Sequence, residues 1–70
     1  MMSRSDALHE FAVDVTNEGQ ILTYTVIATS EIQARDLLVR HFGANTKWER
    51  IRARHVEKAP NETEARVVTV

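Results

Sequence analysis

The sequence has no cysteine, one proline and two glycines among its 70 residues. The lack of cysteine excludes disulfide frameworks, thiolate zinc sites, iron–sulfur clusters and cysteine nucleophiles. Two glycines are too few for a glycine-rich phosphate-binding loop. No hydrophobic run approaches the length of a membrane span, and the first residues lack the apolar stretch of a secretory signal. We therefore expect a cytoplasmic protein.

An excess of charge of one sign is also lacking. Nine Lys+Arg and ten Asp+Glu give a formal net charge of -1, so the chain as a whole has no general attraction to nucleic acid or membranes. Hydrophobic residues make up 43% of the chain, which is typical of a globular protein. A chain of this length forms one small domain with little room for a deep catalytic cleft. We expect a flexible tail over residues 1–8 and a single domain over residues 9–70.

Two runs with a period of two predict a β-hairpin. Residues 9–17 and 20–29 each alternate apolar and polar side chains, and Gly19 between them suits the positive φ of a tight turn. This turn pairs the apolar positions of the two runs, whereas a slip of one residue would turn them outward. The apolar face of the predicted hairpin carries Phe11, Val13, Val15, Leu22, Tyr24, Val26 and Ala28.

A helix is predicted to begin after Ser30, whose hydroxyl can cap the first turn, and Gln33 completes a capping box. An apolar stripe at helical spacing faces the sheet, and Gly43 suits a left-handed helix end. The stripe consists of Ala34, Leu37, Leu38, His41 and Phe42. A third strand after residues 43–46 and a fourth at residues 65–70 complete a β-β-α-β-β order. We expect an α+β fold with an antiparallel sheet of three to four strands and one helix across one face.

Positive charge is concentrated in the third predicted strand. Residues 47–54 carry a net charge of +3 and the rest of the chain -4. On a regular strand Trp48 and three arginines form one row on the face away from the helix, with steps of about 7 Å that suit a phosphate backbone. The indole can stack on a base. The candidate binding residues are Lys47, Trp48, Arg50, Arg52 and Arg54.

Other interpretations of the same residues stay open. Glu10 and Asp14 can pair with the arginines across the sheet, which would make the row an ordinary solvated face. Trp48 can instead fold over the helix end into the core. Ile21 and Ile27 can join Trp48 in an apolar patch that contacts a protein partner or a second copy of the chain.

The histidines give little support to catalysis or metal binding. His9, His41 and His55 lie on three different predicted elements, and no helical His-x-x-x-His pair is present. Only His9 and His55 side by side in a concave pocket would favour catalysis. Ser30 is already used as a helix cap. We expect no enzymatic activity, no metal and no cofactor.

The stretch from Tyr24 to Arg54 loosely resembles the small archaeal ribosomal protein LX in its strand–strand–helix–strand order. The resemblance implies contact with ribosomal RNA. That family is strongly basic, whereas this chain is slightly acidic, so we do not assign the chain to it. The sequence favours a small binding module that contacts a protein or its own copy through the exposed sheet face, with RNA or DNA binding as the alternative.

Overall fold

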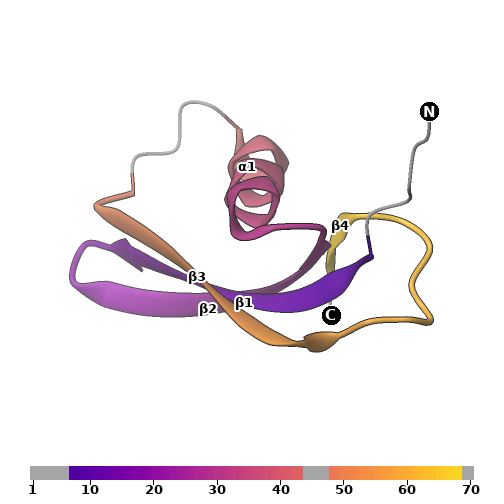
Figure 1. Cartoon of the computed structure of the whole chain (residues 1–70). Helices are drawn as coiled ribbons and strands as arrows, with labels where there is room; N and C mark the ends of the chain where they lie inside the picture. The colour runs from indigo at the N-terminus through magenta and orange to yellow at the C-terminus, as the bar shows by residue number, and fades with distance from the viewer. Residues whose placement is uncertain (1–6, 44–47, 69–70) are drawn as a thin grey trace.

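The computed structural model describes residues 7–43 and 48–68. These residues form β1 (His9–Asn17), β2 (Gln20–Ala28), α1 (Glu31–Phe42), β3 (Arg50–Lys58) and β4 (Arg66–Val68). The four strands make one sheet in the order β3-β1-β2-β4, and all neighbouring strands are antiparallel. The helix α1 lies across one face of this sheet (Figure 1). The predicted α+β fold is confirmed.

The β1–β2 hairpin has the register that its turn residues and alternation predict. Val15 pairs with Leu22, and Phe11 pairs with Val26. Glu18 and Gly19 form the two-residue turn, with φ angles of 52° and 80°. Positive φ at both central positions matches the twist of the two strands, as in the primed hairpin turns. The apolar side chains of both strands therefore face α1 together.

The helix begins and ends where the sequence predicts, with different local chemistry. The Ser30 hydroxyl accepts the Gln33 backbone N–H at 3.1 Å, as an N-cap does. The Gln33 carboxamide, however, accepts the backbone N–H and the hydroxyl of Thr29 at 2.6 and 2.9 Å, so it binds the residue before the cap instead of closing a standard capping box. Gly43 donates its N–H to the Val39 carbonyl at 2.8 Å.

The helix ends in a backbone conformation other than the expected left-handed helical one. Gly43 has φ 97° and ψ 152°. This region of backbone space is essentially restricted to glycine, because a side chain would strain it. Gly43 is thus required for a different conformation from the one that the sequence predicted.

The hydrophobic core lies between α1 and the sheet. Ala34 and Leu38 are the fully buried helix residues, and both have zero exposure. The remaining buried members of this core are Phe11, Val13, Val15, Val26 and Ala28. Partly buried side chains close its margin, among them Leu37, Tyr24, Ile51, Ala53 and Val67. The predicted apolar face of the hairpin is confirmed by the register, and Leu22, near the turn, is 45% exposed on that face.

β3 starts later and runs further than the residue pattern indicates. Its regular pairing with β1 begins at Arg50 and extends to Lys58. A bulge interrupts it: Phe11 pairs with His55 and Glu10 with Glu57, which leaves Val56 without a partner position. His55 lies opposite Phe11 at the last pair of the regular register, just before the bulge. Within the described residues, no helix is long and apolar enough to cross a membrane.

Candidate functional site

The sheet has one face that no described helix or strand covers, and we call it the open face (Figure 1). Strand alternation assigns to this face the residues whose neighbours pack under α1. β1 contributes Asp14 and Thr16 to it, and the paired positions on β2 are Thr23 and Ile21. β3 contributes Arg50, Arg52 and Arg54.

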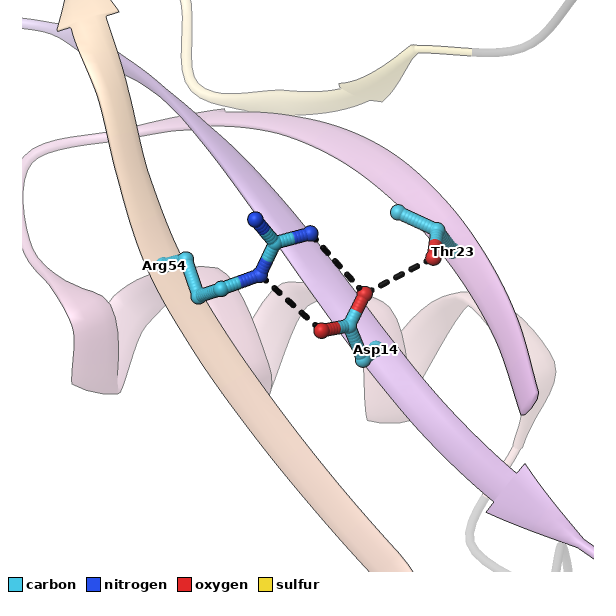
Figure 2. Close-up of polar contacts among 3 residues, drawn as sticks. All are labelled: Asp14, Thr23 and Arg54. Carbon is cyan, nitrogen blue, oxygen red and sulfur yellow. Dashed lines mark hydrogen bonds and ion pairs between the residues drawn. The ribbon is translucent and has the colours of Figure 1, made fainter.

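Three side chains from three strands form a polar cluster on this face (Figure 2). The Arg54 guanidinium donates two hydrogen bonds to the Asp14 carboxylate, from Nε to Oδ2 at 2.9 Å and from Nη2 to Oδ1 at 3.2 Å. The Thr23 hydroxyl donates to Oδ1 of the same carboxylate at 2.7 Å. These bonds, first from Arg54 and then from Thr23, lower the pKa of Asp14 below its usual 3.8. The cluster therefore holds Asp14 ionised and uses Arg54 internally.

The other two arginines of β3 are left for other contacts. Arg50 pairs in register with Thr16 and Arg52 with Asp14. Neither guanidinium has an ion-pair partner in the part of the chain that the structure describes. Together with Ile21, they line a shallow depression of about 150 Å³ that also touches Asp14 and Thr16. We call Thr16, Ile21, Arg50 and Arg52 the open-face patch.

Trp48 does not join the arginine row. Its indole is partly buried, packs against the core on the helix side and meets the Phe42 ring edge-on at 5.5 Å between centroids. The expected row fails at this residue because regular strand geometry starts only at Arg50, so alternation does not extend back to the indole. The other arrangement foreseen for Trp48, over the helix end, is the one observed. Lys47 lies outside the described residues.

The expected apolar patch on the open face is also reduced. Ile27 belongs to this face by alternation but is only 3% exposed, so it offers no contact surface. Ile21, near the hairpin turn, is 69% exposed. With Trp48 on the other side of the sheet, Ile21 is the exposed large apolar side chain left beside Arg50 and Arg52.

The structure brings together two histidines that the sequence had placed on separate elements. His9 Nδ1 lies 3.1 Å from His55 Nε2, and the two ring centroids are 5.0 Å apart. The His9 side chain is partly exposed and that of His55 is exposed. Their contact follows from the pairing of β1 with β3, which places His55 opposite Phe11 and next to His9 on the same face of the sheet. No group of three or more His, Cys, Asp or Glu among residues 7–43 and 48–68 is placed to hold a metal ion.

The open-face patch offers two guanidinium groups, one hydroxyl and one exposed aliphatic side chain. Such a set can bind carboxylates or phosphates and cover an apolar group at the same time. Comparison with known proteins adds no relative: no protein-family model matches the chain, and neither the curated proteins nor the solved structures contain a significant match. The patch must therefore be interpreted from its own chemistry.

Proposed function

We propose that this protein is a non-enzymatic binding module whose open-face patch contacts another protein. The observation that supports this proposal most is the position of Arg50 and Arg52 beside the exposed Ile21, on the sheet face opposite α1. Arginine is enriched at protein interfaces, and an uncovered apolar side chain next to it is the usual composition of a contact surface.

The chemistry of the patch favours a partner with carboxylates around an apolar side chain. Arg50 and Arg52 present planar guanidinium groups that bind carboxylates through paired hydrogen bonds. The Asp14 carboxylate beside them already accepts hydrogen bonds from Arg54 and Thr23. It therefore competes little with a partner's carboxylates for Arg50 and Arg52. Burial of the Ile21 side chain by the partner contributes favourable free energy to binding, because apolar surface is removed from water. The partner we infer is an acidic protein surface with an exposed aliphatic or aromatic residue.

A second copy of the chain is the less favoured protein partner. Two open faces pressed together around a twofold axis would bring Arg50 and Arg52 of each copy close to those of the other. Like charges placed together at an interface are unfavourable. Self-association through this face thus requires an offset arrangement that pairs the patch with acidic residues elsewhere on the chain.

Nucleic-acid binding stays the alternative function, with less support than the residue pattern gave it. Arg50 and Arg52 can still contact phosphates. The indole that was to stack on a base lies on the helix side, and Arg54 is held by Asp14. Two cations give a weak electrostatic site, because affinity for nucleic acid grows with the number of phosphate contacts.

A pull-down from nuclease-treated lysate of the source cells, with charge-matched variants, tests the proposal. The test variant is Arg50→Ser/Arg52→Ser, and the control is Arg35→Ser/Arg40→Ser on exposed positions of α1, which removes the same charge. We expect proteins that wild type and control retain and the test variant loses. Equal retention by both variants would refute a role for the patch, provided that both melt like wild type.

A further inference from the structure

The His9–His55 pair is a second site, independent of the open face. We propose that it binds a divalent transition-metal ion of the Zn²⁺ or Ni²⁺ class through His9 Nδ1 and His55 Nε2. The two nitrogens are 3.1 Å apart and come from adjacent strands, β1 and β3. Imidazole nitrogen is a preferred ligand for these ions, whereas Mg²⁺ and Ca²⁺ select oxygen.

The spacing of the two nitrogens fits a shared metal ion. An ion at the usual Zn–N distance of about 2.0–2.1 Å from both atoms would subtend an angle of about 100° between them. That angle is close to the tetrahedral angle that Zn²⁺ adopts in proteins. The ring centroids are 5.0 Å apart and the ring planes make an angle of 62°, so the rings are neither stacked nor coplanar. To reach a shared ion, each ring has to tilt so that its lone pair leaves the line between the two nitrogens.

The surroundings limit the movement of both rings. Phe11 is 4% exposed, and its ring meets His55 edge-on at 5.6 Å and His9 at 6.3 Å between centroids. A buried aromatic ring beneath two imidazoles restricts the rotamers that each can adopt. The regular β1–β3 register places His55 opposite Phe11, and His9 lies two residues before Phe11 on the same face of β1. The pair is therefore largely arranged before any ion arrives.

The chemistry of binding follows from the hydrogen bond that now joins the rings. One of the two facing nitrogens must carry the proton and the other present a lone pair, since two N–H groups cannot bond each other. To bind an ion, the ring whose facing nitrogen carries the proton moves that proton to its other nitrogen, so each ring presents one lone pair to the metal. The remaining coordination positions are open to water. Lys58, in register with His9, is the cation that opposes this binding.

The test is a Zn²⁺ titration of tag-free, ¹⁵N-labelled protein, followed through the imidazole nitrogens. His41, on the last turn of α1 in ring contact with Phe42, is the built-in control. We expect His9 Nδ1 and His55 Nε2 to shift together while both His41 nitrogens stay in place. Shifts at one ring alone, at His41 equally, or at none would overturn the proposal, and this readout needs no variant.

Calorimetry with single variants measures the contribution of each ring. His9→Ala and His55→Ala should each weaken Zn²⁺ binding by about tenfold or more, because a chelate with one arm removed loses the advantage of effective concentration. His41→Ala should leave the affinity within about twofold, since it lies outside the pair. Mg²⁺ should produce no heat. An unchanged affinity in His55→Ala, or Mg²⁺ binding as strong as Zn²⁺ binding, would contradict a two-imidazole site.

Discussion

On the open face, the carboxylate of one residue, Asp14, connects three strands through hydrogen bonds. Asp14 lies on the middle strand of the three and receives Arg54 from β3 and Thr23 from β2 (Figure 2). The Asp14 side chain is 24% exposed, so the cluster lies at the surface and solvent partly screens its electrostatic interactions. The role we assign to Asp14 is to satisfy Arg54 and to fix the position of β3 relative to β1.

The first prediction concerns the pH dependence of stability. The folded state lowers the pKa of Asp14, so the unfolded chain binds the proton more tightly than the folded chain does. This contribution to stability is present above the usual aspartate pKa of 3.8 and is lost as the pH falls through the lowered pKa of folded Asp14. Asp14→Asn should therefore melt at a lower temperature than wild type at pH 7.

The difference between the two proteins should shrink as the pH falls below the carboxyl pKa, because wild type then loses the same interaction. Thermal melting followed by circular dichroism across this range measures it. Thr23→Val, which removes only the hydroxyl donor, should show a smaller loss in the same direction. A gap between Asp14→Asn and wild type that stayed constant from neutral to acid pH would mean that the ionised carboxylate contributes nothing to folding.

The second prediction isolates the backbone of Gly43. A Cβ added there meets no atom within 4 Å, so Gly43→Ala tests the positive φ and not a steric clash. We expect a loss of about 1–3 kcal/mol in the free energy of unfolding. Gly19→Asn is the comparison, since φ 80° in a hairpin turn is a region that asparagine tolerates, and it should lose less. Equal losses at the two sites would contradict the assignment of Gly43 to a glycine-only conformation.

Among the helix and strands, the contact that forms the hydrophobic core is the packing of α1 on the β1–β2 hairpin. Leu38 has zero exposure and lies at the centre of the core with Val13, Val15 and Val26. The third prediction is that Leu38→Ala costs about 2–5 kcal/mol, through lost burial and the cavity left behind. Ile32→Ala on the same helix is the control: at 74% exposure it should stay within about 0.5 kcal/mol. Chemical denaturation measures both, and similar losses would mean that α1 packs through a different side.

Most of this element structure could be predicted from the sequence. The hairpin register was predictable because the alternation of residues 9–17 and 20–29 and the turn at Glu18-Gly19 point independently to the same pairing. The helix was predictable because Ser30 and Gly43 mark its two ends. In these segments local preference and tertiary packing agree.

The third strand shows where sequence analysis stops. Alternation predicts a face for each side chain only inside a regular strand. Trp48 lies an even number of positions from the arginines, but it comes before the regular strand, so alternation assigned it to the wrong face. The bulge at Val56 shifts pairing by one residue without a glycine or turn residue to mark it. The His9–His55 contact depends on the pairing of β1 with β3, which is not visible in a single sequence.

The whole molecule combines a near-neutral chain with a local concentration of positive charge. The formal net charge is -1, but the open face exposes Arg50 and Arg52. The fourth prediction is that the protein elutes as a monomer of 8.0 kDa in light scattering and forms no complex with mixed-sequence oligonucleotides at physiological salt. An oligonucleotide complex that weakens steeply with salt would favour the nucleic-acid alternative. A salt-resistant dimer would favour self-association.

The central claim is that a protein partner binds the open-face patch, and amide chemical-shift mapping tests it most directly. A protein retained in the pull-down is added to the ¹⁵N-labelled chain, and the shifted amides are placed on the structure. We predict that the largest shifts cluster at Thr16, Ile21, Arg50 and Arg52 and vanish in Arg50→Ser/Arg52→Ser. Shifts centred on α1, with the open face unchanged, would contradict the account.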